Sequence, residues 1–226
     1  MKEELQQYLY KAFGNYPPYA TNNINLDYSI GGQVHIRFEL GGELLKNGTR
    51  ERVAQASQRA VTLFKEAFPE PENKIWVLIY EYSGILINET PNFLCQQFPA
   101  EVFAAFYNQV ERVYECVGNV YELGKEHNEG NNCKIIIGKV KVKDIKYQHI
   151  LEAIANSEMG FEPAIDSRVY FIDPKTDRIF RMYDDRGCFV ESNSADKIRE
   201  LYQRRNDWII DYHRPEIDKY FQQFPC

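Results

Sequence analysis

The 226-residue chain lacks the residue patterns that mark metal sites and disulfide frameworks. Its five cysteines form an odd set without a C-x-x-C pair, which fits reduced thiols better than disulfides or a zinc site. Its four histidines are scattered, and none lies four residues from another. We therefore expect no metal and no cofactor.

A long apolar run, an N-terminal signal pattern and a basic excess are absent as well. The net charge is −6, which makes nucleic acid an unlikely main partner and favours a basic one. We expect a bacterial-type cytoplasmic protein with no membrane partner.

Turn-forming residues and short alternating runs are concentrated in residues 169–190. This pattern predicts three strands joined by two tight turns. In the first turn, over 173–177, Pro174 presets a type I turn between aspartates. In the second, over 184–187, we expect Gly187 to supply the positive φ of a three- or four-residue hairpin.

Hydrophobic periodicity predicts the remaining elements. Helices are expected over 2–13, 49–67 and 194–209, from Tyr147 until Gly160 ends it, and from Pro215. Strands are expected over 30–40, 74–82 and 133–145. The predicted fold class is α+β: a mixed or antiparallel sheet with helices packed on it, ending in a hairpin and two helices. We expect one domain over 1–226; two lobes, 1–130 and 131–226, are the alternative.

Two segments allow competing interpretations. After Pro99, apolar residues at helical spacing predict a helix through residue 117, with a strand over 111–117 as the alternative. Lys139, Lys141 and Lys143 share one face of a predicted strand. We interpret them as a solvated edge rather than a surface for nucleic acid or an acidic protein.

The run Met-Tyr-Asp-Asp-Arg-Gly at 182–187 and the run Trp-Ile-Ile-Asp-Tyr at 208–212 resemble a bacterial domain-of-unknown-function family marked by a YDDRG motif followed by WI-x-DY. The resemblance extends upstream through 143–154 and through Arg37–Gly41, and so covers most of the chain. His213-Arg214 departs from the pattern. The resemblance implies a shared fold and no established activity.

The YDDRG run supplies the first candidate site residues: Tyr183, Asp184, Asp185, Arg186 and Gly187. In a functional interpretation, the carboxylates of Asp184 and Asp185 bind Mg²⁺ or Mn²⁺, and Arg186 binds a phosphate. Turn chemistry alone explains the same residue types, with the arginine paired to a carboxylate such as that of Asp211. We favour the structural interpretation.

Trp208, Asp211 and His213 form a second candidate group. A histidine oriented by an aspartate is a possible general base, but the sequence offers no matching nucleophile. A helix-to-helix corner with Trp208 in the core is the favoured interpretation.

Two functional hypotheses follow. The first is a non-enzymatic protein-binding module, of the immunity type that neutralises a toxin, with a basic partner. The second is a metal-assisted phosphate-handling enzyme built on Asp184, Asp185 and Arg186. Gly31-Gly32 and Gly41-Gly42 lack the spacing of a phosphate-binding loop, which weakens the second hypothesis.

Overall fold

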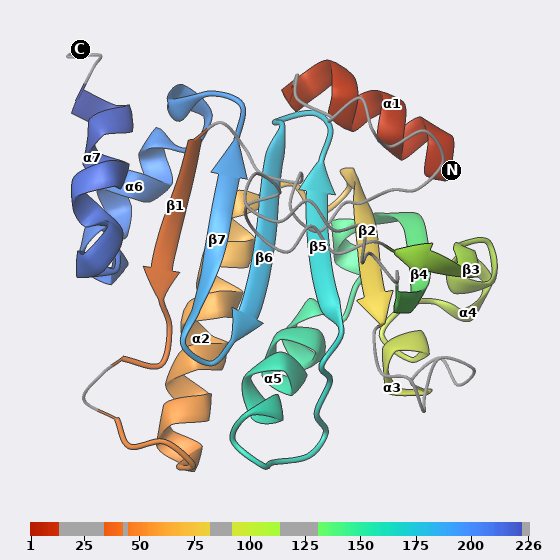
Figure 1. Cartoon of the computed structure of the whole chain (residues 1–226), viewed down its shortest axis with the longest axis horizontal. Coiled ribbons are helices and arrows are strands. Elements are labelled where there is room, and N and C mark those ends of the chain that lie inside the picture. The colour runs from red at the N-terminus through yellow and green to blue at the C-terminus, as the bar shows by residue number, and fades with distance from the viewer. Residues whose placement is uncertain (14–33, 43–44, 82–91, 114–130, 223–226) are drawn as a thin grey trace, which may run out of the picture.

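The computed structural model describes residues 1–13, 34–42, 45–81, 92–113 and 131–222 (Figure 1). Within these ranges, seven strands form one sheet in the order β1-β7-β6-β5-β2-β4-β3, and every neighbouring pair is antiparallel. The strands are β1 (Val34–Glu39), β2 (Lys74–Glu81), β3 (Tyr107–Val113), β4 (Asn131–Lys141), β5 (Arg168–Asp173), β6 (Arg178–Asp184) and β7 (Gly187–Ser192). The predicted α+β class is confirmed, with an antiparallel sheet.

Helices cover both faces of this sheet. They are α1 (Lys2–Phe13), α2 (Arg50–Ala67), α3 (Asn92–Cys95), α4 (Ala100–Ala104), α5 (Tyr147–Ser157), α6 (Arg199–Arg204) and α7 (Arg214–Gln222). No helix in the described ranges is long and apolar enough to cross a membrane. Strands from both halves of the chain alternate in the sheet, since β2 lies between β5 and β4.

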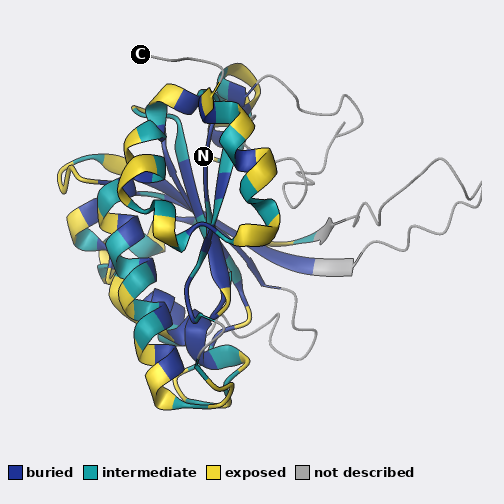
Figure 2. Cartoon of the chain, turned by 90° about the vertical axis from the view of Figure 1, so that its left-hand side faces the viewer, coloured by how far each residue is buried: buried dark blue, intermediate teal, exposed yellow. Residues whose placement is uncertain are grey.

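The larger core lies between the sheet and the helices α2 and α5 (Figure 2). Thr49 caps α2, since its hydroxyl accepts the backbone N–H of Arg52 at 3.4 Å. Phe64, on the apolar stripe of α2, lies 4.9 Å from the ring of Phe171 and 5.6 Å from that of Phe180. Burial of this stripe fixes α2 across the strands.

The opposite face carries a smaller core under α1. Leu5, Leu9 and Phe13 are buried against strand residues that include Trp76 and Leu78. Tyr8 also donates a hydrogen bond from its hydroxyl to Asp177 in the β5–β6 turn, at 2.8 Å. The predicted amphipathic helix is therefore confirmed.

The helix predicted from Pro99 to residue 117 is wrong beyond Ala104. Phe106 packs over Gly138 of β4, where a Cβ atom would lie 2.1 Å from the Phe106 ring. From Tyr107 onward the chain pairs with β4, so strand pairing overrides the helical periodicity. Residues 114–117 lie outside the described ranges.

The lysine face lies mostly beyond the end of β3, which pairs with β4 only as far as Ile137. Lys141 and Lys143 both bind Glu72, at 2.9 and 2.5 Å, and Lys139 forms an ion pair with Glu4. An edge position is thus correct for this part of β4, whereas its first half lies between β2 and β3.

The helix predicted over 194–209 is divided. A 3₁₀ turn over Ala195–Lys197 precedes α6, another over Asn206–Trp208 follows it, and the Ser194 side chain makes no capping bond. Ile209 then forms a bridge with Phe38 on β1. After the helix ends, the chain therefore runs along the β1 edge of the sheet.

Candidate functional site

The YDDRG run forms the tight turn between β6 and β7. Asp184 pairs with Gly187, so Asp185 and Arg186 form a two-residue loop, shorter than expected, and the register shifts at Tyr183. Asp185 is fully buried and accepts a hydrogen bond from Nε of Arg52 on α2. Arg52 is also buried, and its Nη1 donates to the carbonyls of Gly42 and Leu45, each at 2.9 Å.

This ion pair fastens the hairpin to two other parts of the chain. The backbone N–H of Leu40 donates to the carbonyl of Arg186 at 3.0 Å, and Gln55 of α2 donates to the carbonyl of Gly41 at 2.8 Å. A Cβ atom at Gly41 would lie 2.9 Å from the carbonyl oxygen of Asp185. We call the contact between the hairpin, residues 40–42 with Leu45, and α2 the hairpin clasp.

Asp184 binds within its own turn. One carboxylate oxygen accepts the backbone N–H of Arg186 at 2.7 Å, and the other accepts its Nε at 2.8 Å. The hydrogen bond to Asp184 raises the pKa of Arg186. Arg186 also lies 3.5 Å from Glu158, and its side chain is 58% exposed. The expected pairing of Arg186 with Asp211 is wrong, because Asp211 pairs with Arg214 at 3.3 Å.

Gly187 is required for space rather than for backbone conformation. Its φ is not positive, contrary to expectation. A Cβ atom here would lie 2.2 Å from the hydroxyl of Tyr183 and 2.7 Å from the carbonyl oxygen of Phe38. Glycine therefore allows β1 and the Tyr183 ring to approach β7 closely.

The two carboxylates of the motif point to different partners. Asp184 stays in the turn with Arg186, and Asp185 enters the protein toward Arg52. Across the described residues, no group of three histidine, cysteine, aspartate or glutamate side chains is placed to hold a metal ion. Each carboxylate of the motif is thus bound to an arginine of this chain.

The second candidate group lies where α6 gives way to α7. Trp208 is half-buried, with the Arg59 guanidinium 5.0 Å and the Arg205 guanidinium 4.6 Å from its ring. His213 Nδ1 lies 3.3 Å from Nη1 of Arg37. Arginine can only donate, so Nδ1 accepts this bond. The alternative in which Asp211 orients His213 as a general base is not what this contact shows.

Arg37 on β1 connects the two candidate groups and was not among the predicted site residues. Its Nε donates to the hydroxyl of Tyr183 at 2.9 Å, while its Nη1 faces His213. Burial raises the pKa of Tyr183. The alternating pattern of β1 places Arg37 on the polar face, but only the structure shows its two partners.

An open groove of about 540 Å³ lies beside the hairpin clasp, between α2 and the segment before α7. Three carboxylates line it, from Glu39, Asp207 and Asp211. Among the described lining residues, Arg59 is the one cation. It donates to the carbonyl of Glu39 at 3.1 Å and lies over Trp208. The other lining residues are Gly42, Leu45, Gln55, Ile209, Ile210 and Tyr212. We call this the acidic groove.

A smaller cleft of about 240 Å³ lies on the other side of the hairpin. Its charged lining is mixed, because Arg168 and Arg181 face the same space as the acids. Asp166 accepts a hydrogen bond from Ser157, and Asp184 is held by Arg186. This cleft lacks the single sign of charge that would select one kind of ligand.

Comparison with known proteins gives a family match. Residues 9–213 match the model of a family described as Domain of unknown function (DUF3885). Over 78 residues, the chain is 35% identical to the uncharacterized protein YnaE of Bacillus subtilis (strain 168). The aligned part is 32% of this chain and 37% of that relative, so the chain spans little more than a third of it. No solved structure matches.

Proposed function

The chain belongs to the DUF3885 family of domains of unknown function, and on this premise we propose that it is a protein-binding module. In this proposal the acidic groove binds a basic segment of a partner protein. Neutralisation of a basic toxin, as in immunity proteins, is a narrower form of the same proposal.

The exposure of Tyr212 in the acidic groove carries the proposal. Tyr212 is 84% exposed, the largest value among the exposed large hydrophobic residues of the described ranges. Asp211 beside it is 97% exposed. Tyrosines at protein interfaces provide a large rigid contact area, and they are frequent among the residues that dominate binding energy.

Charge favours a basic partner. Glu39, Asp207 and Asp211 outnumber Arg59 in the groove, and the whole chain carries a charge of −6. A lysine or arginine from a partner would find carboxylates on both sides of the groove and the ring of Tyr212 for a cation–π contact. Such complementarity mainly raises the association rate and excludes acidic competitors.

The enzyme hypothesis loses support from the geometry of its own residues. Asp184 and Asp185 each bind an arginine of this chain, and they face different directions. A metal ion bound between them would have to displace two ion pairs. In the groove, Asp207 and Asp211 are exposed, and Asp211 remains open to a partner beside its ion pair with Arg214.

The test is binding of a fluorescent peptide that alternates lysine or arginine with leucine, measured by polarisation against an acidic peptide of the same length. We expect the basic peptide to bind, and we expect Tyr212→Ala or the double variant Asp207→Asn/Asp211→Asn to weaken it by about tenfold or more. Added salt should also weaken binding.

Tyr10→Ala is the matched control, because Tyr10 is 64% exposed on α1 and does not line the groove. It should bind the peptide as the wild type does. Equal binding of basic and acidic peptides, or equal losses in Tyr10→Ala and Tyr212→Ala, would contradict the proposal.

A further inference from the structure

The two edges of the sheet differ in how they are covered. At β1, Ile209 forms a bridge with Phe38, and the backbone N–H of Ile210 donates to the carbonyl of Arg37 at 3.2 Å. The ring of Tyr220 on α7 also lies 5.6 Å from that of His35. The helices α6 and α7 lie beside this edge (Figure 1). The chain itself therefore covers the β1 edge.

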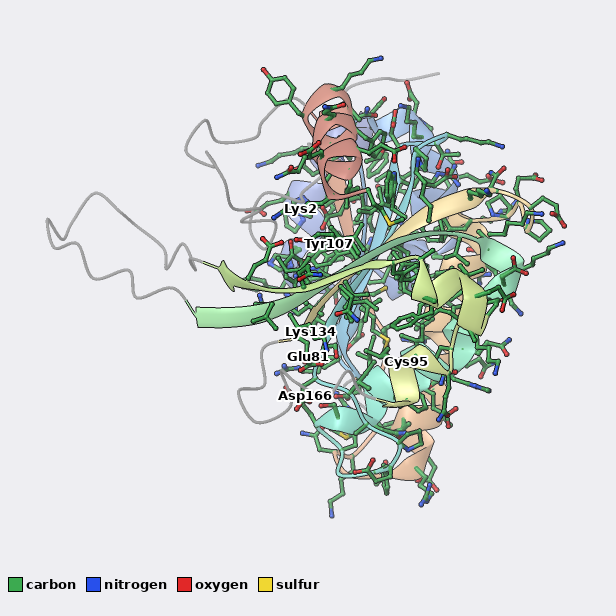
Figure 3. All side chains as sticks on the ribbon, turned by 90° about the vertical axis from the view of Figure 1, so that its right-hand side faces the viewer. Lys2, Glu81, Cys95, Tyr107, Lys134 and Asp166 are labelled. Atoms are coloured by element: carbon green, nitrogen blue, oxygen red, sulfur yellow. The ribbon has the colours of Figure 1, made fainter. Side chains whose placement is uncertain are left out.

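The β3 edge has no such cover in the described part of the chain. β3 pairs with β4 on one side, and no described strand pairs with its other side. Figure 3 shows β3 and β4 reaching away from the body of the protein as a two-stranded ribbon. An unpaired edge offers a row of backbone donors and acceptors to another strand.

The sequence of β3 carries only part of the usual protection of a free edge, in the charged residues Glu111 and Arg112. Tyr107–Val113 contains neither proline nor lysine, the residues that most often prevent strand addition. Val110 is 46% exposed. The charge of Glu111 is neutralised by an ion pair with Lys2 of α1 and a hydrogen bond from Tyr107; Lys2 and Tyr107 lie close together in Figure 3.

We propose that β3 pairs antiparallel with β3 of a second copy of this chain, about a twofold axis at Val110. Val110 then faces the same residue of the second copy, and Gln109 faces Glu111. No like charges face each other in these pairs, and an exposed apolar contact becomes buried. Since every pair in the sheet is already antiparallel, the addition continues its pattern.

This dimer is independent of the protein-binding function. The acidic groove includes Glu39 of β1, at the opposite end of the sheet from β3. Two grooves would remain open in the dimer, one on each copy. Failure of one proposal leaves the other intact.

The test is sedimentation velocity of the wild-type chain from micromolar to submillimolar concentration. We expect a species of twice the chain mass that Val110→Lys converts to monomer, with the dissociation constant raised by about tenfold or more. Amide hydrogen exchange at 109–111 should slow as the wild-type concentration rises. Tyr10→Lys, which also places a lysine at an exposed tyrosine, should remain dimeric.

A wild type that stays monomeric at every concentration would overturn the proposal. A Val110→Lys variant that dimerises as strongly as the wild type would overturn it as well. Because Val110 is exposed, the variant should melt at the wild-type temperature at concentrations too low for the wild type to dimerise. If the variant melts at a lower temperature, its folding is impaired and hydrogen exchange of the wild type replaces it as the test. Exchange at 109–111 that does not depend on protein concentration would contradict the pairing.

Discussion

Asp185 in the β6–β7 turn forms a buried ion pair with Arg52, which lies 133 residues earlier on α2. The two side chains bring the hairpin, the segment after β1 and the start of α2 to one point. A buried charge that loses its partner is far more costly than an exposed one. The stability of the hairpin clasp therefore depends on this pair.

Asp185→Asn should lower the free energy of unfolding by about 3–5 kcal/mol, because it leaves Arg52 buried without a counter-charge. Arg186→Gln should cost only about 0–1 kcal/mol, since the Arg186 side chain is 58% exposed. Urea unfolding followed by circular dichroism measures both. Equal losses in the two variants would contradict this account of the motif.

Gly187→Ala should lower the free energy of unfolding by about 1–3 kcal/mol, as is usual for overpacking. The added methyl group would lie 2.2 Å from the hydroxyl of Tyr183. Adding Tyr183→Phe should recover part of the loss, because it removes that oxygen, whereas the carbonyl of Phe38 remains. A double-mutant cycle in urea measures the coupling, and strict additivity would show that the contact is not the cause.

Thr49→Ala should cost about 1 kcal/mol, because it removes the side-chain cap of α2. The Thr49 hydroxyl accepts the backbone N–H of Arg52, so the cap also positions the residue that binds Asp185. Thr49→Ser should retain most of the stability. Thermal unfolding of the two variants checks this, and a Thr49→Ser variant as unstable as Thr49→Ala would contradict a capping role.

Much of the fold could be predicted from local patterns. The three-stranded run over 169–190, the strand β2 and the capped helix α2 each follow from residues that are close in the sequence. Asp184 accepts the backbone N–H of Arg186, the Asx turn that the sequence indicates. These elements are found because their cause is local turn chemistry or amphipathic spacing.

The errors involve partners that are distant in sequence. Residues 107–113 carry apolar side chains that suit a helix or a strand, and only pairing with β4 decides between them. The sequence predicts that Gly187 supplies a positive φ, but its role is to leave space for the carbonyl of Phe38 on another strand. The sequence of α2 gives no sign that Arg52 is buried, because its partner Asp185 is distant in the chain. Local periodicity carries no information about such contacts.

His35 lies on the polar face of β1 near the C-terminal helix. Its ring is 5.6 Å from that of Tyr220 and 6.2 Å from that of Phe189. Burial lowers the pKa of His35, and the nearby His213 lowers it further, while Glu216 acts in the opposite direction. The folded protein therefore binds a proton at His35 less readily than the unfolded chain does.

The free energy of unfolding should accordingly fall as the pH decreases. At a pH above the histidine pKa of the unfolded chain, about 6.5, the lowered pKa of His35 does not reduce the free energy of unfolding. As the pH drops from there through the folded pKa, the unfolded chain takes up the proton first, and stability is lost. His35→Phe keeps an aromatic ring between Tyr220 and Phe189 but cannot be protonated.

Urea unfolding at neutral pH and at a pH below the histidine pKa of the unfolded chain should therefore show a smaller loss of stability in His35→Phe than in the wild type. Parallel losses would mean that other groups cause the acid sensitivity and that His35 is not part of it.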